Sequence, residues 1–380
     1  MVARRSRRVL VELWNAALAA VEPKAAVERA LKDRAVASAL ARARRVGVFS
    51  VGKAAAAMAS AVDGPGPRLT VVPRGYASRT RTRGRVLRAS HPEPDHSSVR
   101  AARAALAFFR GFDRGDVILC LISGGASSLL CVPKPGVSLA EKRRRVRRLM
   151  DDGASIVEIN ALRTRLSAVK GGRLGRATKA RLVTLVLSDV PGDRPALVGS
   201  GPTIRRRKGD IVRVVARNRD GLEAAARRAR EMGLSARIRP RRLRGSALVK
   251  GAEFGLEARS LSPGQALLAG GETSVSFDEG FERGAGGRCL VFGAGAAFLL
   301  DSDAGLRLLA AGSDGIDGNS RAAGAFVDGS TLRRAGVDHV LDAFGRADTA
   351  PLFWALGDLF TPGPTGTNVG DWVFAYREKR

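Results

Sequence analysis

Short apolar runs that stop at small polar turns constrain the fold of this chain more than any other feature. In the first of them, residues 46–51 have the pattern of a buried strand, which ends at Gly52-Lys53 and is followed by an alanine-rich segment at residues 54–59. Apolar runs of about four to eight residues between turn residues are typical of buried strands, and alanine is the strongest helix former. The order strand, tight turn, helix therefore predicts an α/β unit.

The same order recurs along the chain. Residues 24–45 have helical periodicity, Asp95 is a potential N-cap for a helix at residues 97–109, and the segments at residues 138–141 and 155–158 match the capping-box pattern. Further strands are predicted at residues 69–72, 86–89, 116–122 and 182–187. Because strands alternate with helices, the sheet that they form is predicted to be parallel.

A change in composition near residue 240 indicates a second domain. Residues 211–238 are predicted to form a strand, a helix and a strand, after which turn residues accumulate. The elements expected next are a strand ending at Gly270-Gly271-Glu272, a helix at residues 288–300, a strand at residues 306–311 and a loop at residues 360–371. We predict a larger domain at residues 1–240 and a smaller α/β domain at residues 241–380.

Several classes of protein are disfavoured by composition. No stretch reaches the roughly 18 consecutive apolar residues of a membrane-spanning helix, so no membrane partner is expected. The chain has three cysteines and three histidines, which disfavours a disulfide framework, a zinc site or a Ser-His-Asp triad. The apolar patch after the basic amino terminus is interrupted by Glu12 and Asn15. We therefore predict no export and a cytoplasmic location.

The formal net charge of +29 raises the question of nucleic-acid binding. The arginines are scattered through predicted helices, for example at residues 41–45 and 143–148, and few aromatic residues accompany them for base stacking. A basic, solvated surface explains this pattern better than a nucleic-acid groove does, and ion-pair networks would be one physical use for it. Nucleic acid is therefore not an expected partner.

Nearly every predicted strand stops at a Gly, Ser, Thr or Asp cluster. In an open parallel sheet the carboxyl ends of the strands form the ligand crevice, so these clusters are expected to converge. Backbone amides freed by glycine suit a phosphate, and carboxylates suit a divalent cation. The combination favours a nucleotide-phosphate site, although Lys53 lacks the full Walker A spacing and residues 123–127 match a simple turn equally well.

The remaining candidate residues also have simple structural explanations. Asp189 and Asp193 share one loop and could hold magnesium, but aspartate is also common in turns. His91, in a proline-stiffened loop, could act as acid, base or donor, or could be a structural histidine. The basic residues at 170–173 could neutralise phosphate or end a helix.

Read together and in order, these clusters resemble the glycerate 2-kinase family, whose carboxyl-terminal region is the MOFRL domain and whose amino-terminal region is Rossmann-like. The matching blocks are SVGKAAAAMA (50–59), SHPEPDHSS (90–98), LISGGASSLL (121–130), INALRTRLSAVKGGRL (159–174), LSDVPGD (187–193), VGSGPT (198–203), AGGETSVSF (269–277), GAGGR (284–288), AGSDGIDGNSRAAGA (311–325) and GPTGTNVGD (363–371). The resemblance spans almost the whole chain.

The resemblance implies a kinase that transfers the γ-phosphoryl group of ATP to the 2-hydroxyl of D-glycerate, with Mg²⁺, in a cleft between the two domains. The implied catalytic residues are Lys53 and Arg288. The implied substrate-binding residues are Ser123, Gly124, Gly125, Ser127, His91 and Arg163. The implied nucleotide-binding residues are Lys170, Gly171, Gly172, Ser188, Gly201, Thr203, Gly270, Glu272 and Thr365. The implied metal ligands are Asp189, Asp193, Asp314 and Asp317.

The chain departs from the family pattern at a few positions. Residues 289–291 replace the usual Asn-Gln-Glu. His96 and Arg321 each stand where an acidic residue is usual, and Gly370 stands where Asn is usual. The acceptor could therefore be a related hydroxy acid. A hydroxypyruvate reductase would need a G-x-G-x-x-G fingerprint, which is lacking after residue 51, and a basic nucleic-acid-binding protein on the same fold would bind with steep salt dependence. The expected assembly is a monomer or a homodimer.

Overall fold

The computed structural model describes residues 2–75, 82–154, 156–275, 284–346 and 348–379, and the chain forms two compact units. The parallel-sheet unit comprises Glu22–Arg217 and Gly366–Asn368. The mixed-sheet unit comprises Met1–Val21, Asn218–Thr365 and Val369–Arg380. The sequence prediction placed the division between the domains at residue 240, whereas in the structure it falls at residue 217. The reason is that the elements that follow residue 217 pack into the second sheet.

The parallel-sheet unit is a six-stranded sheet in the order β3-β2-β1-β4-β5-β6, and every pair of neighbouring strands is parallel. The strands are β1 Val46–Val51, β2 Arg68–Pro73, β3 Arg85–Ala89, β4 Val117–Ile122, β5 Arg181–Ser188 and β6 Ile211–Arg217. This is the strand order of a dinucleotide-binding Rossmann sheet, with the switch of direction between β1 and β4. The parallel sheet predicted from strand and helix alternation is therefore confirmed.

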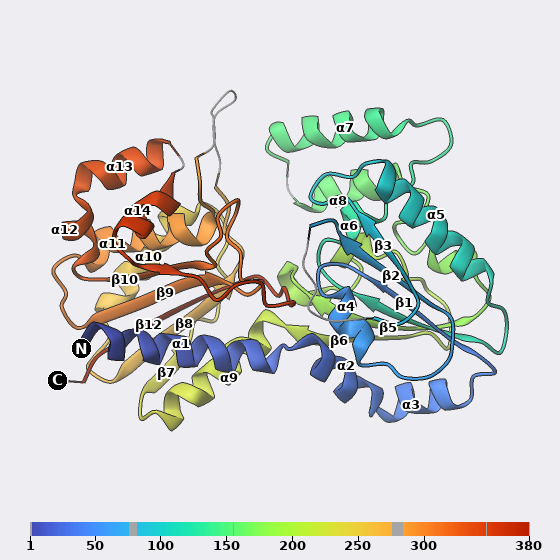
Figure 1. Ribbon diagram of the computed structural model, residues 1–380, viewed down its shortest axis with the longest axis horizontal. Helices are drawn as coiled ribbons and strands as arrows, with labels where there is room; N and C mark the ends of the chain where they lie inside the picture. Colours follow the sequence, from blue (N-terminus) through green and yellow to red (C-terminus); the bar gives the residue numbers. More distant parts are fainter. Residues whose placement is uncertain (1, 76–81, 155, 276–283, 347, 380) are drawn as a thin grey trace. The chain divides into compact units, whose positions relative to one another are not determined.

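The helices of this unit surround the sheet (Figure 1). They are α2 Pro23–Leu31, α3 Arg34–Ala41, α4 Ala55–Ser60, α5 His96–Arg110, α6 Ala126–Leu129, α7 Leu139–Asp151 and α8 Ile156–Arg165, with short 3₁₀ turns at Gly175–Ala177, Pro191–Asp193 and Val198–Ser200.

Capping residues explain where these helices begin. The carboxylate of Asp95 accepts a hydrogen bond from the amide of Ser97 at 2.7 Å, and Asp95 therefore caps the start of α5 as predicted. Ser138 accepts the amide of Glu141 at 3.0 Å and begins α7, whereas the second predicted box starts at residue 155, outside the described residues. The single helix expected at residues 24–45 is instead α2 and α3, because Asp33 caps a new helix there.

The mixed-sheet unit has the strand order β11-β10-β9-β12-β8-β7, in which β7 and β8 are parallel and the other described pairs are antiparallel. Its strands are β7 Ser235–Ile238, β8 Gln265–Gly271, β9 Leu306–Gly312, β10 Gly324–Asp328, β11 Leu359–Phe360 and β12 Asp371–Arg377. Its helices are α1 Val2–Ala20, α9 Asn218–Glu231, α10 Ala247–Arg259, α11 Arg288–Leu300, α12 Thr331–Ala335, α13 Val337–Gly345 and α14 Thr349–Ala355. The prediction of an α/β fold with a second α/β domain is confirmed.

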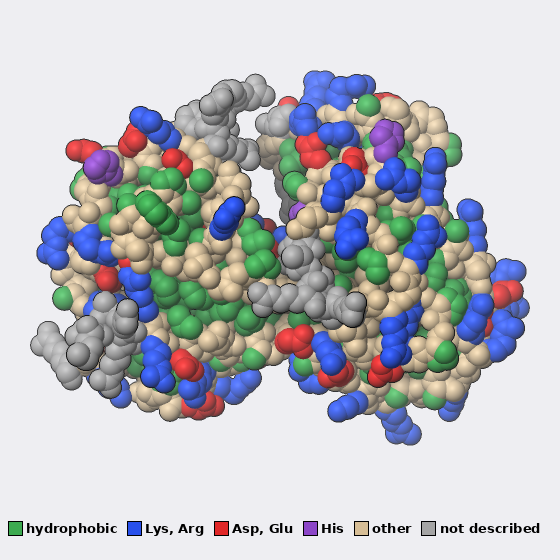
Figure 2. Space-filling model, in the orientation of Figure 1, with side chains coloured by type: hydrophobic (Ala, Val, Ile, Leu, Met, Phe, Trp, Pro, Cys, Tyr) green, Lys and Arg blue, Asp and Glu red, His purple; other side chains and the backbone are tan. Residues whose placement is uncertain are grey.

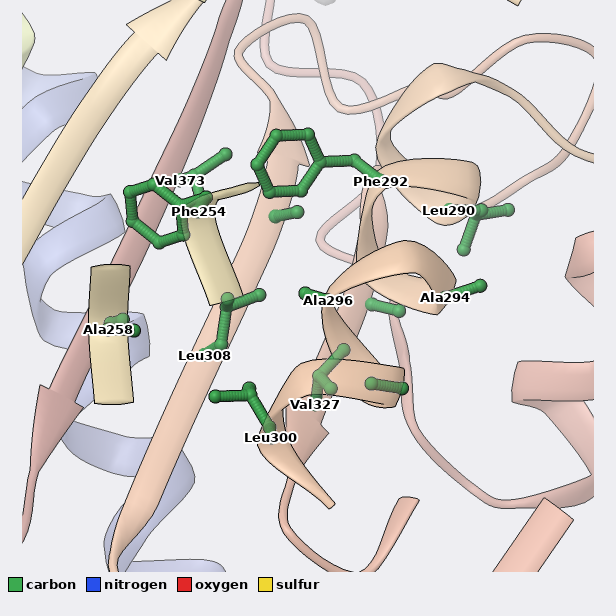
Figure 3. Close-up of a cluster of buried hydrophobic side chains, with 14 of the residues drawn as sticks. Phe254, Ala258, Leu290, Phe292, Ala294, Ala296, Leu300, Leu308, Val327 and Val373 are labelled. Carbon is green, nitrogen blue, oxygen red and sulfur yellow. The ribbon is translucent and has the colours of Figure 1, made fainter. Parts of the chain in front are cut away.

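The core of the mixed-sheet unit lies between its sheet and the helix pair α10 and α11 (Figure 3). Phe254 of α10 and Phe292 of α11 are almost fully buried, and their ring centroids lie 5.8 Å apart. Glycine allows the two helices to approach so closely, because a Cβ on Gly251 would come within 2.1 Å of the Phe292 carbonyl oxygen. Close packing of this kind stabilises the helix that presents Arg288.

The surface of the described residues is strongly basic. On the face shown in Figure 2, Lys and Arg side chains lie singly and in small groups over both units. Within the part of the chain that the structure describes, no helix combines the length and the apolar character needed to cross a bilayer.

Candidate functional site

The turns that follow β1 and β4 are joined at the carboxyl edge of the parallel sheet. The Lys53 amide donates to the carbonyl oxygen of Gly124 at 2.9 Å, and the buried Ser123 hydroxyl accepts the amide of Ala54 at 3.1 Å. Gly52 has φ +127°, and a Cβ at that position would lie 2.1 Å from the Ser123 hydroxyl oxygen. Glycine is required here because the two turns touch.

Lys53 and His91 converge on the turn after β4. A Cβ on Gly125 would lie 3.2 Å from Nε2 of His91 and 3.5 Å from Cγ of Lys53. Gly125 also has φ +83°, in the left-handed region that favours glycine. The ends of β1, β3 and β4 therefore bring a cation and an imidazole to one glycine-rich turn, as the sequence predicted for strand ends in a parallel sheet.

A carboxylate and an amide lie against the same turn. A Cβ on Gly124 would come 1.9 Å from Oδ2 of Asp189 and 3.2 Å from Nδ2 of Asn368. Asp189 follows β5, and Asn368 belongs to the segment that returns to this unit from near the end of the chain. Asn368 was not predicted as a site residue, although its loop is one of the matching blocks.

Lys170 supports the turn that contains Ser127. Its ammonium donates to the carbonyl oxygen of Ser127 at 2.5 Å and also contacts the Ser127 hydroxyl, which lies 3.2 Å from the hydroxyl of Ser200. The amide of Gly171 donates to the carbonyl oxygen of Ser200 at 2.9 Å. Lys170 is only 2% exposed. In this arrangement Lys170 and Gly171 support the turn, and Ser200 is a further supporting residue that the sequence did not single out.

The remaining candidates of this unit lie on supporting loops. The Gly172 amide donates to the carbonyl oxygen of Gly201 at 2.8 Å, which joins the two glycine-rich segments. Thr203 is buried and accepts a hydrogen bond from Thr184 of β5 at 3.2 Å. Ser188 donates to Asp193 at 2.8 Å. These contacts order the loops around the carboxyl edge.

A second buried lysine lies near Lys170. Burial lowers the pKa of Lys142, and burial together with the charges of Lys142 and Arg163 holds the pKa of Lys170 well below its usual value. Burial also lowers the pKa of Arg163. In the described residues no hydrogen bond of good geometry reaches the buried Lys142 ammonium, and the neighbouring Cys131 thiol offsets only part of the effect of burial on its pKa. An ionised group in such a place costs free energy that folding must supply.

Lys142→Met is therefore expected to stabilise the protein by about 1–2 kcal/mol at pH 7, since methionine fills a similar volume without a charge. Urea unfolding at pH 7 measures the change. The surface change Lys32→Met, on an exposed side chain, is the control. A lower free energy of unfolding for Lys142→Met than for the wild type would show that Lys142 has a stabilising partner.

The mixed-sheet unit presents Arg288 between two carboxylates. Its guanidinium binds Asp371 through two hydrogen bonds of 2.5 and 2.9 Å, and its third nitrogen lies 2.9 Å from Glu272. Burial opposes ionisation, but the charges of Asp371 and Glu272 outweigh it and raise the pKa of Arg288. Asp371 begins β12, opposite Gly271 of β8 and Gly312 of β9. The sequence prediction missed Asp371, because a loop was expected to extend to that residue.

Two further predicted residues of this unit order the backbone of that edge. A Cβ on Gly270 would lie 2.0 Å from the amide oxygen of the buried Asn218. The hydroxyl of Thr365 donates to the carbonyl oxygen of Ser313 at 2.6 Å, and its amide donates to that of Asp314 at 3.2 Å.

The four predicted metal ligands do not form one cluster within either unit. In the described residues no three His, Cys, Asp or Glu side chains gather closely enough to hold a metal ion. Asp317 instead caps α11, since its carboxylate accepts the amides of Cys289 at 3.0 Å and Leu290 at 2.8 Å. Asp193 accepts from Ser188. Asp189 is the carboxylate that lies directly against the glycine-rich turn.

The cap at Asp317 predicts a pH dependence. Burial is the main cause that raises the pKa of Asp317, to about 7, in spite of its two amide hydrogen bonds. Between the ordinary value of 3.8 and about 7, the folded protein keeps a proton that the unfolded chain releases. Stability due to this group is therefore lost as the pH rises through that window, by up to about 1.4 kcal/mol per pH unit.

Asp317→Asn should flatten this slope. The measurement is the free energy of urea unfolding between pH 4 and pH 8, with Asp338→Asn at an exposed position of α13 as the control. Equal slopes in the wild type and Asp317→Asn would contradict the expectation.

Comparison with known proteins identifies the family. Residues 9–230 match a domain of unknown function, DUF4147, and residues 265–371 match the MOFRL family. A D-glycerate 2-kinase of Thermotoga maritima is 33% identical, with 92% of this chain and 95% of the relative covered. A crystal structure named glycerate kinase, from the same organism, has a TM-score of 0.80 at 30% identity and covers 97% of this chain and 99% of its own.

The chain belongs to the MOFRL-type glycerate kinase family. It is an enzyme of the kinase class. A relative in Agrobacterium vitis, 37% identical over 96% of this chain and 93% of its own, is provisionally named a hydroxypyruvate reductase. That name does not fit the turn after β1, where Gly52-Lys53-Ala54 replaces the dinucleotide fingerprint. We regard it as a misnaming within the glycerate kinase family.

Two of the departures from the family pattern have a physical explanation in this kinase. Cys289 is 3% exposed and packs in the core, so an apolar side chain suits it. Gly370 has φ +88°, a conformation that asparagine also tolerates, which accounts for Gly in place of the usual Asn. His96 and Arg321 are exposed. Nothing in the structure explains the change at Arg321.

Proposed function

We propose that this glycerate kinase transfers the γ-phosphoryl group of ATP to the 2-hydroxyl of D-glycerate and releases ADP and 2-phospho-D-glycerate. The observation that carries the proposal is the convergence of Lys53, His91 and Asp189 on the glycine-rich turn after β4. The choice of D-glycerate as the substrate rests on the names of the relatives, a D-glycerate 2-kinase and a glycerate kinase. Phosphoryl transfer needs mainly positioning and neutralisation of charge, which a lysine and a glycine-rich turn can provide.

In the proposed reaction the 2-hydroxyl oxygen of glycerate attacks the γ-phosphorus, and the bond from that phosphorus to the β,γ-bridging oxygen breaks. The hydroxyl proton passes to solvent or to a base, for which His91 is the candidate. Lys53 would neutralise the charge on the transferring group. The glycine-rich turn at residues 123–127, held by Lys170, would receive phosphate or carboxylate oxygens at its backbone amides.

The residues present fit a magnesium ion bound to the nucleotide. Mg²⁺ is usually held by one or two carboxylates together with phosphate oxygens, so a three-residue protein site is not required. Asp189, which lies where any Cβ on Gly124 would clash with it, is the proposed protein ligand. Bound Mg²⁺ would neutralise phosphate charge.

Arg288 is proposed to bind the substrate or the transferring group from the mixed-sheet unit. The Arg288 guanidinium is already oriented by Asp371 and Glu272, and a guanidinium can bind a carboxylate or a phosphate through two hydrogen bonds. Orientation by the two acids would lower the entropy lost when a ligand binds.

The test is a coupled assay for ADP release with ATP, Mg²⁺ and D-glycerate, with the position of the phosphate in the product determined by ³¹P NMR. The expected product is the 2-phosphate. Glycolate, L-glycerate and hydroxypyruvate serve as comparison acceptors. A 3-phosphate product would overturn the proposed position of transfer, and turnover with another hydroxy acid but not with D-glycerate would overturn the proposed acceptor.

A further inference from the structure

A cationic pocket lies at the amino ends of the strands in the parallel sheet, at the end opposite to the turns that follow β1 and β4. It has a volume of about 670 Å³ and is formed by the segments that lead into β4, β5 and β6. Six of its nine lining residues are basic: Arg114, Arg176, Lys179, Arg205, Arg206 and Arg207. Because the strands are parallel, their amino ends lie at the edge opposite to the turns that hold Lys53 and Ser123. The basic residues of the pocket therefore lie at the opposite end of the strands from the proposed transfer site. The lining residue Gly171 belongs to the loop that also supports the turn at Ser127 and Ser200.

Arg205 forms the base of this pocket and fixes the backbone around it. It pairs with Asp210 at 2.7 Å, and both side chains are less than a tenth exposed. Its other nitrogens donate to the carbonyl oxygens of Thr178 at 2.8 Å and Ala180 at 2.7 Å, and also to that of Gly175. The loops before β5 and β6 are thereby tied together.

The other five cations differ from Arg205 in their ionic contacts, since in the described residues no ion pair joins any of them to Asp or Glu. Two of them are nevertheless oriented, because Arg207 donates to the carbonyl oxygens of Lys179 at 2.7 Å and Ala180 at 3.0 Å, and Arg176 donates to that of Gly171 at 3.0 Å. Five like charges around one hollow repel one another, and a multivalent anion would relieve that repulsion.

We propose that this pocket binds a short chain of phosphoryl groups. Its volume suits a small ligand, guanidinium groups bind phosphate oxygens in pairs, and the five cations around it match the charge of a tri- or oligophosphate. Among the described residues, no aromatic side chain lines the pocket for stacking on a base. The phosphate chain itself is therefore the recognised group, either free or as the tail of a nucleotide.

The test is calorimetric titration of the full chain with sodium tripolyphosphate at about 150 mM salt, where weak surface attraction is screened. The pocket variant is Arg114→Gln, Lys179→Gln and Arg206→Gln. The control variant removes the same charge from α5 through Arg100→Gln, Arg103→Gln and Arg110→Gln, which are exposed and without ion pairs in the described residues.

The pocket variant should raise the Kd for tripolyphosphate by more than about tenfold, while the control variant stays within about twofold of the wild type. Kinase turnover should be unchanged in the pocket variant. Equal weakening in both variants would show attraction to net charge alone, and loss of binding in Lys53→Ala would place the probe at the transfer site; either result overturns the proposal.

Titrations with ATP and with AMP separate the two sources of the phosphate chain. If the phosphate chain alone is recognised, the pocket substitutions should weaken binding of ATP and of tripolyphosphate by the same factor. If a nucleotide is required, the pocket variant should lose more affinity for ATP. Binding of AMP that depends on the pocket as strongly as that of ATP would contradict recognition of a chain.

Discussion

Lys53→Ala is expected to lower kcat with D-glycerate by about a thousandfold, because removal of one preorganised group that stabilises transition-state charge costs a factor of that order. KM should change little, since the charge to be neutralised is largest in the transition state. The measurement is the steady-state rate of ADP release. The side chain of Lys53 is half-buried in a tightly joined turn, so circular dichroism should accompany the assay.

Two further variants serve as controls for this test. Lys32→Ala removes a lysine on the surface of the same unit and should leave kcat unchanged. Lys53→Arg keeps the charge but changes its shape, and it should recover part of the lost rate. A kcat for Lys53→Ala within about threefold of the wild type would remove Lys53 from the mechanism.

Arg288→Ala is expected to reduce both activity and stability. It leaves Asp371, whose side chain is 8% exposed, without its bidentate partner, and breaking such a pair costs about 2–3 kcal/mol after allowance for the partial exposure of Arg288. Urea unfolding measures this loss. The ADP-release assay should show a kcat/KM lower by about a hundredfold or more, since the guanidinium proposed to bind the substrate is lost as well.

Asp371→Asn distinguishes the two effects of Arg288. In the double variant with Arg288→Ala, the uncompensated carboxylate is gone, so much of the stability should return. The activity should not return, because the guanidinium is still missing. Recovery of activity together with stability would show that Arg288 acts only by supporting β12.

The parts of the fold that could be predicted are those specified by local sequence. The strand at residues 46–51 is a mainly apolar run that ends at a Gly-Lys turn, and α11 coincides with its predicted bounds at residues 288–300. The convergence of Lys53, His91 and Asp189 followed from one rule, that parallel strands end at the same edge. The chemical roles proposed for these three residues are predictions that the kinetic assays test.

The parts that could not be predicted depend on distant partners. β12 pairs with β8 and β9, which lie more than fifty residues away along the chain, and it directly follows a loop rich in Gly, Pro and Thr. α1 packs on α9, some two hundred residues later. The basic character of Lys170 indicated a phosphate ligand or a helix end, whereas its burial against Ser127 depends on loops that meet only in the folded chain.

The position of β12 in the middle of the second sheet has a consequence for the order of folding during synthesis. The six strands of the parallel sheet are complete once residue 217 has left the ribosome, whereas the mixed sheet lacks a central strand until residue 377 has been made. Until then one edge of β8 and one edge of β9 have no partner strand, because β12 begins about sixty residues after the end of β9 and about one hundred after the end of β8. Unpaired strand edges are prone to aggregate. Slow translation of the segment between β9 and β12 would therefore lengthen the period in which the nascent enzyme is most exposed to misassembly.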